Sequence, residues 1–409
     1  MNSYIFIVGK SDSLGASAES IRRLGYKVGI FQDKNTSLKQ PDIFDRIILV
    51  DFTNLEKEIR TFSFEDSPVA GLLCTYENYI VAKSQIGLYL NLPVASVQSA
   101  EMSTDKYLMR QAFMRANTSI TPRFARVTTA DEALAFATAT SFPLILKPAN
   151  LVKSLLVLRC NDRAELLENF AYAQTTIAEL YRKYNVHSRE PQLVLEEFIN
   201  GKICSVEAFV DHDGKAHFCE GIVSLTTAQE HGADDNYLYS RRLPLELDAA
   251  LKDKLFEVSA IGVKALDMRS TAAHIELIYD ENSVKIVEIG ARIGGYRPRM
   301  YSYSYGINMI EQEVRLAIGQ LPKLSGTFKN FSAVYELFPT REGMFSSIGG
   351  HINQEEYAYY NVKPKPGQTI GPAKQGYKAS AVVIVTHHDR QRFDELCQQV
   401  DTLTVEVAS

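Results

Sequence analysis

Tryptophan is absent from this sequence and cysteine is scarce, with five residues at positions 74, 160, 204, 219 and 397. The cysteines are scattered, odd in number, and form no Cys-x-x-Cys pair. This pattern argues against a disulfide framework and against a zinc site, and it favours a reducing compartment. We therefore expect a cytoplasmic protein.

Long apolar runs and a strong charge of one sign are also missing. The apolar run near the N-terminus extends only from Tyr4 to Val8 and has no basic lead-in, so it predicts a core strand rather than a signal peptide. No uninterrupted apolar stretch approaches the length of a transmembrane helix. The net charge of −5 gives no electrostatic reason to bind nucleic acid or an anionic membrane, and we expect neither partner.

What is present is typical of a globular protein of two or three domains: 409 residues, of which 45% are hydrophobic and 23% charged. Strand and helix signals alternate through residues 1–100, which predicts an α/β domain with a parallel sheet covered by helices. Leu321-Pro322 marks a boundary. Residues 321–409 carry their own strand and helix signals, and we expect a C-terminal α+β lobe that closes one side of the site.

Two glutamates, Glu276 and Glu288, are the most informative residues. Residues 272–279 and 284–289 read as two strands joined by the turn 280–283, and a hairpin centred on Asn282 places the two glutamates opposite one another. Opposed side chains lie about 4.5–5.5 Å apart at Cβ, and carboxylates that close suit Mg²⁺. Without metal, mutual repulsion should raise the pKa of one carboxylate. The alternative is a solvent-facing hairpin with two unrelated glutamates.

Four segments, read in order, resemble the motifs of ATP-grasp ligases. They are Asp105-Lys106 at a helix start, residues 142–148 (FPLILKP), residues 195–201 (LEEFING), and Glu276 with residues 288–292 (EIGAR). The resemblance covers about residues 1–320, and the last motif with the appended tail is most similar to ligases that join amino acids into dipeptides. It implies an ATP-grasp fold, with a nucleotide-binding domain at 101–320 between the 1–100 and 321–409 segments. Its lid subdomain would span about 120–195 and its central subdomain about 196–320.

The resemblance also implies roles for particular residues at the nucleotide. Lys106 and Lys147 would bind phosphate oxygens, and Ser154 or Lys153 would assist from the loop 149–155. Glu196, Glu197 and Ile199 match the segment that holds adenine, with Glu196 favoured as the side chain that points inward.

At the reacting end, Glu276 and Glu288 would bind the metal. Glu288 and Arg292 would be catalytic, with Arg292 holding an acyl-phosphate. The alternative for Arg292 is a surface salt bridge to Glu288. Arg297 and Arg299 either bind a substrate carboxylate or lie solvated on a loop. His274 shares the face of Glu276, and a hydrogen-bonded structural role is favoured for it over a catalytic one.

Two departures from the family pattern stand out. The loop 149–155 contains no glycine, which restricts how closely its backbone can approach phosphate. Position 290 is glycine where the family's metal motif often has asparagine. Ile203 stands near the place of the family's ribose-binding glutamate, so the ribose contact is unassigned.

The implied activity is a carboxylate–amine ligase that uses ATP and Mg²⁺, with Mn²⁺ able to substitute, and proceeds through an acyl-phosphate. Small-molecule carboxylate and amine substrates, amino-acid-like in kind, are the expected partners, and a homodimer is left open. One alternative is an ATP-grasp carboxylase or purine-pathway enzyme that activates bicarbonate or formate. The other is a degenerate nucleotide-binding protein, for which the glycine-free loop and Gly290 are the evidence.

Overall fold

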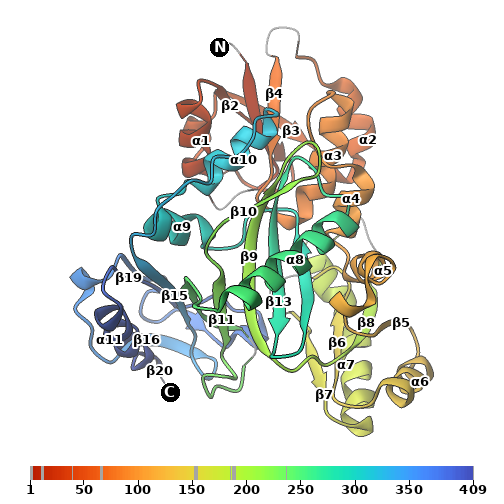
Figure 1. The fold of residues 1–409 in the computed structure, drawn as a ribbon, viewed down its shortest axis with the longest axis vertical. Helices are drawn as coiled ribbons and strands as arrows, with labels where there is room; N and C mark the ends of the chain where they lie inside the picture. Colours follow the sequence, from red (N-terminus) through yellow and green to blue (C-terminus); the bar gives the residue numbers. More distant parts are fainter. Residues whose placement is uncertain are drawn as a thin grey trace.

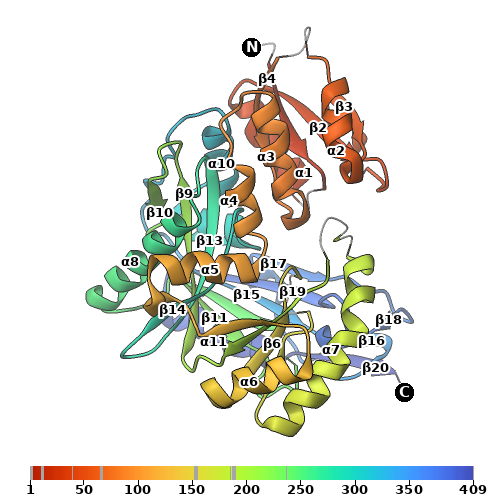
Figure 2. The ribbon, with the colours of Figure 1, turned by 90° about the vertical axis from the view of Figure 1, so that its right-hand side faces the viewer.

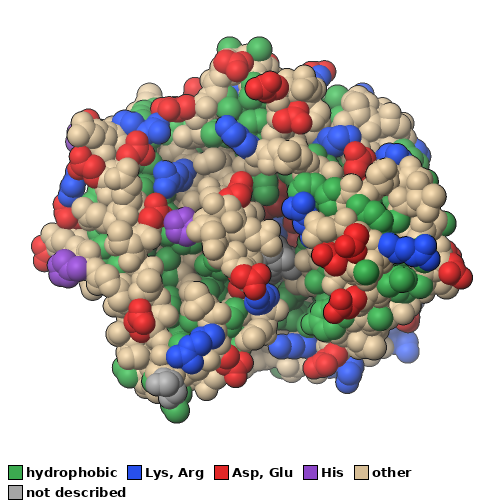
Figure 3. All heavy atoms as spheres, turned by 90° about the horizontal axis from the view of Figure 1, so that it is seen from below, with side chains coloured by type: hydrophobic (Ala, Val, Ile, Leu, Met, Phe, Trp, Pro, Cys, Tyr) green, Lys and Arg blue, Asp and Glu red, His purple; other side chains and the backbone are tan. Residues whose placement is uncertain are grey.

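The computed structural model describes residues 3–10, 13–38, 40–64, 68–151, 155–184, 186, 190–235 and 237–408. Four sheets organise them: the parallel sheet of the N-terminal domain at one end, a long antiparallel sheet, and two smaller antiparallel sheets (Figures 1 and 2). No helix in these ranges is both long and apolar enough to cross a bilayer. Figure 3 shows acidic and basic side chains interspersed over one face, as the small net charge predicts.

The N-terminal domain confirms the predicted parallel sheet, whose strand order is β3-β2-β1-β4. Its elements are β1 (Tyr4–Val8), α1 (Leu14–Arg23), β2 (Lys27–Asp33), β3 (Arg46–Val50), α2 (Leu55–Glu58), β4 (Val69–Leu73) and α3 (Ile80–Tyr89). Helix α10 (Met309–Ala317) returns from far along the chain to pack on α1 and β4. Gly71 permits this approach, because a Cβ there would lie 2.4 Å from the carbonyl oxygen of Ala317.

Two short helices connect this domain to the next sheet: α4 (Val97–Met102) and α5 (Lys106–Ala116). A four-stranded antiparallel sheet follows, in the order β5-β8-β6-β7. It contains β5 (Phe124–Val127), α6 (Ala130–Thr140), β6 (Leu144–Pro148), β7 (Leu158–Cys160), α7 (Arg163–Lys183) and β8 (Leu193–Glu197). Helices α6 and α7 pack on it around a core of its own.

The long sheet runs in the order β14-β13-β9-β11-β12-β15-β19-β17, and β10 pairs with β9 beside it. Its first strands are β9 (Lys202–Val210), β10 (Ala216–Phe218), β11 (Val223–Thr227), β12 (Leu238–Leu243), β13 (Thr271–Tyr279) and β14 (Val284–Gly290). Helix α8 (Ala249–Ala265) covers this part (Figure 1).

The C-terminal segment extends that same sheet, because β15 (Phe331–Leu337) pairs with β12 and with β19 (Ala381–His387). Strand β17 (Tyr359–Val362) completes the edge. A three-stranded sheet is formed by β16 (Gly343–Gly349), β18 (Thr369–Ile370) and β20 (Thr404–Ala408), and α11 (Arg390–Asp401) packs on β19 and β15. A division into separate domains at residue 321 stays a prediction.

The alternative that placed Arg297 and Arg299 on a loop is wrong. Residues Arg297–Tyr305 form helix α9, with Pro298 in its first turn, where proline lacks no needed hydrogen bond. The Arg-Pro-Arg sequence is therefore a helix start, and the tyrosines that follow lie along the helix, Tyr301 and Tyr305 being buried.

Candidate active site

The hairpin of β13 and β14 pairs Glu276 directly with Glu288, as predicted. The route differs from the simple hairpin, because Tyr279 pairs with Val284 and a bulge at Val287 restores the register. Both glutamates consequently lie on the same face of the sheet, with 21% of the Glu276 side chain and 30% of the Glu288 side chain exposed.

Lys106 lies against this pair from the start of α5, which Asp105 caps by accepting hydrogen bonds from the backbone of Tyr107 and Leu108. The Lys106 Nζ is 3.2 Å from Oε2 of Glu288 and donates to the carbonyl oxygen of Leu151 at 2.8 Å. It thus connects the hairpin with the loop that follows β6.

The expected rise in a carboxylate pKa is wrong for Glu288. Burial by itself would raise this pKa, but the positive charges of Lys106, Lys147 and Arg292 lower it to about 2. Three nearby cations outweigh the repulsion from one opposed carboxylate, so Glu288 is ionised at neutral pH.

Lys147 and Glu196 lie on one face of the four-stranded sheet β5-β8-β6-β7, since β6 and β8 are antiparallel and pair Ile145 with Glu196. The Lys147 Nζ is 2.7 Å from Oε2 of Glu196. Arg110, one turn after Lys106 on α5, donates to both carboxylate oxygens of Glu196 at 2.8 and 3.1 Å. Glu196 does point inward as predicted, and there it balances two buried cations.

Two cations, Arg110 and Lys147, contact the single carboxylate of Glu196, and the pKa values of both Lys147 and Glu196 lie below their ordinary values. Burial lowers the pKa of Lys147 to about 8 despite the attraction of Glu196, because Arg110 and Lys106 oppose its charge. Burial would raise the pKa of Glu196, but Arg110 and Lys147 together lower it to about 2. Glu196 is thus ionised at neutral pH, whereas the positive charge of Lys147 is less stable in the fold than it would be in water.

The other residues predicted near adenine are not part of the cluster of Lys147, Glu196 and Arg110. Glu197 ends β8 and is partly buried, and its Oε2 accepts a hydrogen bond from the backbone N–H of Arg123 at 3.1 Å. Ile199 follows the strand and is partly buried. Ser154 and Lys153 lie outside the described residues. The nucleotide roles of all these residues stay predictions.

A network of buried hydrogen bonds connects Glu276 with the interior of the long sheet. His274 contacts Oε1 of Glu276 through Nε2 at 3.1 Å and Oε1 of Glu207 through Nδ1 at 2.6 Å. Burial would lower the pKa of His274, but the two carboxylates raise it to about 9, so both ring nitrogens donate. The structural role favoured for His274 agrees with these contacts. Gly294 leaves room for the ring, because a Cβ there would lie 2.4 Å from Nδ1.

Arg297 completes this network, and the alternative of a solvated residue is wrong. Its side chain is buried and donates to Ser205 Oγ at 3.0 Å and to Oε1 of Glu207 at 3.2 Å. Arg299, by contrast, lies over the ring of Tyr359, with its guanidinium carbon 4.3 Å from the ring centre.

Arg292 pairs with Glu77 of the N-terminal domain, so the alternative of a salt bridge to Glu288 is wrong. Its Nε is 2.6 Å from Oε2 of Glu77, and its Nη1 donates to the carbonyl oxygen of Ile293 at 3.1 Å. Burial would lower the arginine pKa, but Glu77 above all raises it, so Arg292 is charged.

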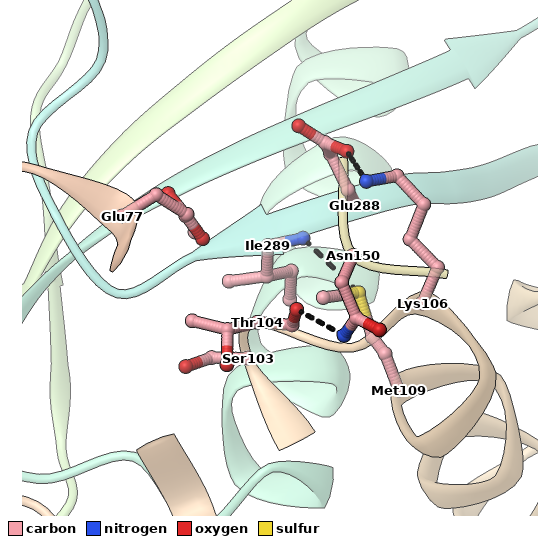
Figure 4. A pocket seen from close by; sticks show the side chains of 9 residues that line it. Glu77, Ser103, Thr104, Lys106, Met109, Asn150, Glu288 and Ile289 are labelled. Atoms are coloured by element: carbon pink, nitrogen blue, oxygen red, sulfur yellow. Dashed lines mark hydrogen bonds and ion pairs between the residues drawn. The ribbon is translucent and has the colours of Figure 1, made fainter. Parts of the chain in front are cut away.

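Glu77, Lys106 and Glu288 meet at a pocket that opens to solvent. Glu77 lies on one side and Lys106 with Glu288 on the other (Figure 4). The pocket is lined by Glu77, Ser103, Thr104, Lys106, Met109, Asn150, Glu288, Ile289 and Gly290.

The donor set of the hairpin fits Mg²⁺. Glu276 and Glu288 offer hard carboxylate oxygens on one face and are partly exposed. No cluster of three or more histidine, cysteine, aspartate or glutamate residues within the described ranges could hold a metal ion. Two carboxylates are enough for Mg²⁺ when substrate phosphates and water supply the other ligands.

Sequence reasoning missed Arg110, Glu207 and Glu77. A signal existed for Arg110, which follows Lys106 by four residues and stands between Met109 and Ala112 on the apolar face of the helix. Ser205 and Glu207 interrupt an apolar strand at alternate positions, which indicates a polar face. Nothing near Glu77 in the sequence points to Arg292, because 215 residues separate them.

The chain is similar to known proteins in sequence and in fold. Residues 140–316 match the sequence profile of the ATP-grasp domain. The solved L-amino acid ligase from Bacillus licheniformis superposes with a TM-score of 0.78 at 20% identity, over 100% of this chain and 99% of that one. This similarity confirms the predicted ATP-grasp fold.

Two curated relatives are similar in sequence. The 3-methyl-D-ornithine–L-lysine ligase of Methanosarcina mazei is 26% identical over 183 residues, which are 44% of this chain and 46% of that protein. The alanine–anticapsin ligase of Bacillus subtilis is 26% identical over 226 residues, 51% of this chain and 45% of that protein. The matched region thus spans about half the length of these relatives.

Proposed function

We propose that this chain, an ATP-grasp protein through residues 140–316, is an ATP-dependent ligase that joins a carboxylate to an amine. One observation carries the proposal: Glu288 lies opposite Glu276, and the positive charges of Lys106, Lys147 and Arg292 all act on it, the Lys106 Nζ from 3.2 Å. Oxygen ligands for a metal, cations for phosphates and a donor for an oxyanion are the parts that phosphoryl transfer from ATP to a carboxylate requires.

In this proposal the two lysines bind ATP from different elements. Lys147 reaches the phosphates from the end of β6 and Lys106 from the start of α5. Mg²⁺ held by Glu276 and Glu288 would neutralise charge on the phosphate oxygens. Burial lowers the pKa of Lys147 to about 8, which means that its positive charge is poorly stabilised in the fold. A phosphate group bound beside it would stabilise that charge.

The reaction proceeds in two steps. A carboxylate oxygen of the substrate attacks the γ-phosphorus and ADP leaves, which forms an acyl-phosphate. The amine then attacks the carbonyl carbon and inorganic phosphate leaves, which forms the amide. Arg292 binds the acyl-phosphate and donates to the oxyanion of the second step, because its guanidinium stays charged.

We further propose amino-acid-like substrates. The printed names of the relatives describe ligases of amino acids: lysine with a methyl-ornithine, and alanine with anticapsin. The structural neighbour is named an L-amino acid ligase.

The test is ADP release from Mg·ATP in the presence of a mixed amino-acid pool. The proposal expects ADP release that depends on amino acids, together with an amide product detected by mass spectrometry. ADP release that depends on bicarbonate or formate would favour the carboxylase alternative. Nucleotide binding in calorimetry without any turnover would favour the degenerate binding protein.

A further inference from the structure

Glu77 joins the N-terminal domain to the reacting end of the pocket. It follows β4, at the carboxyl end of a parallel strand, whereas Arg292 follows β14 of the long sheet. Their contact is short, at 2.6 Å between Oε2 and Nε, and 15% of the Glu77 side chain and 21% of the Arg292 side chain are exposed. A partly buried, charge-assisted hydrogen bond of this length orients the guanidinium strongly.

Gly290 provides the space in which this pair meets. A Cβ at position 290 would lie 3.6 Å from Oε2 of Glu77 and 3.9 Å from the guanidinium carbon of Arg292. An alanine would fit there in ordinary contact, but an amide side chain would compete with the Glu77 carboxylate for the same volume. The position at which this chain has glycine in place of the family's asparagine is therefore the position beside which the Glu77 carboxylate of the N-terminal domain lies.

The contacts of Arg292 also determine which of its nitrogens is available. Nε is held by Glu77, and Nη1 by the carbonyl oxygen of Ile293. Nη2 has no hydrogen-bond partner within the described part of the chain. With two nitrogens fixed, the direction of the third is fixed as well, because the guanidinium is planar.

We propose that Glu77 is a positioning residue for Arg292: it fixes the guanidinium so that Nη2 faces the acyl-phosphate and the oxyanion, and Gly290 leaves the room for it to do so. This inference rests on the proposed function, because it assigns Arg292 a role in turnover. It makes the N-terminal domain part of the catalytic arrangement, since the arginine is aimed by a residue of that domain.

The first experiment compares Glu77→Gln with Glu56→Gln. Glu56 is a matched control in the same domain, a glutamate whose side chain is 89% exposed and which pairs with Arg60 at 3.6 Å. Glu77→Gln is expected to lower kcat by about 10- to 100-fold, because a small misplacement of a catalytic group has effects of that size. The KM for ATP should stay within about 2-fold, since the lysines are untouched. Glu56→Gln should behave as wild type. An unchanged kcat in Glu77→Gln would overturn the proposal.

A double-mutant cycle distinguishes positioning from a merely structural role. If Glu77 acts through Arg292, Glu77→Gln should cause little further loss of kcat in an Arg292→Lys background, because the group it positions is already replaced. Losses that multiply in the double mutant would overturn the proposal.

Gly290→Asn tests the space requirement against Gly295→Asn, a position at which a Cβ would meet nothing within 4 Å. We expect Gly290→Asn to lower kcat as Glu77→Gln does, and the two changes together to be no worse than either alone. Full activity in Gly290→Asn would contradict the assigned role of the glycine.

A readout independent of turnover separates this inference from the proposed function. The Nε–H resonance of Arg292, observed in protein with isotope-labelled arginine and identified by its loss in Arg292→Lys, should shift in Glu77→Gln and stay in place in Glu56→Gln. A resonance that does not shift means that the ion pair is absent and overturns the inference. Wild-type protein without turnover on any substrate pool would instead refute the proposed function.

Discussion

Arg110 and Lys147 contact the same carboxylate, yet we expect their replacement by methionine to have different effects on stability. Arg110→Met removes the bidentate partner of Glu196, and it also removes the donor to the carbonyl oxygens of Ile286 and Val287, at 2.9 and 2.7 Å. Lys147→Met removes one contact of 2.7 Å and leaves the arginine in place.

The magnitude follows from the charges. Glu196 has an ordinary pKa of 4.5 that falls to about 2 in the folded protein, which corresponds to about 3 kcal/mol of stability at neutral pH. Because the folded-state pKa is the lower one, this contribution is complete above pH 4.5 and is lost as the pH falls towards 2. Arg110→Met should therefore cost about 3–5 kcal/mol, the usual cost of leaving a buried charge without its partner.

Lys147→Met should cost about 1 kcal/mol or less. The pKa of Lys147 is lowered from 10.5 to about 8, so its charge is less favourable in the fold than in water. Replacing Lys147 by methionine removes the cost of burying its charge, and this gain offsets the ion pair that Glu196 loses. The lysine is thus retained at a cost in stability, which agrees with a role in binding phosphate.

Urea unfolding followed by far-UV circular dichroism measures both changes, since the chain has no tryptophan to report by fluorescence. Arg115→Met, at an exposed position near the end of the same helix, is the control and should unfold as wild type. Equal losses for Arg110→Met and Lys147→Met, or full stability of Arg110→Met, would refute the reasoning.

Three further predictions follow from the same structure. Lys147→Met should weaken binding of Mg·ATP by about 10-fold or more in calorimetry, because it removes a charge-assisted contact; unchanged affinity would exclude Lys147 from the phosphate site. Glu288→Gln should lower ADP release by more than about 100-fold while Glu281→Gln, exposed in the same hairpin, stays active; equal activity of the two would exclude the metal role. Glu313 is buried on α10, neither of its carboxylate oxygens has a hydrogen-bond partner among the residues that the structure describes, and burial raises its pKa from 4.5 to about 7. Since the folded-state pKa is the higher one, stability should fall by about 3 kcal/mol as the pH rises from 4.5 through 7, and Glu313→Gln should remove most of this loss in urea unfolding at pH values across that range.

Local chemistry was enough for much of the fold. The parallel N-terminal sheet was predictable because apolar strand signals and helix signals alternate there. Helix α9 was not, because Arg-Pro-Arg suits both a loop and a helix start. Packing of Tyr301 and Tyr305 into the core decided between them.

The sequence by itself determined the hairpin that carries Glu276 and Glu288, since two strands joined by a short turn specify it. Their direct opposition also depends on the bulge at Val287, which the structure shows. The sequence also determined the order of the four motifs and, through them, the ATP-grasp fold. Only the tertiary structure decided the partners of the charges: Glu77 for Arg292, Arg110 for Glu196, and Glu207 for His274. Each pair joins elements far apart in the chain, and the strength of an ion pair depends on distance and burial, which no local pattern of residues encodes.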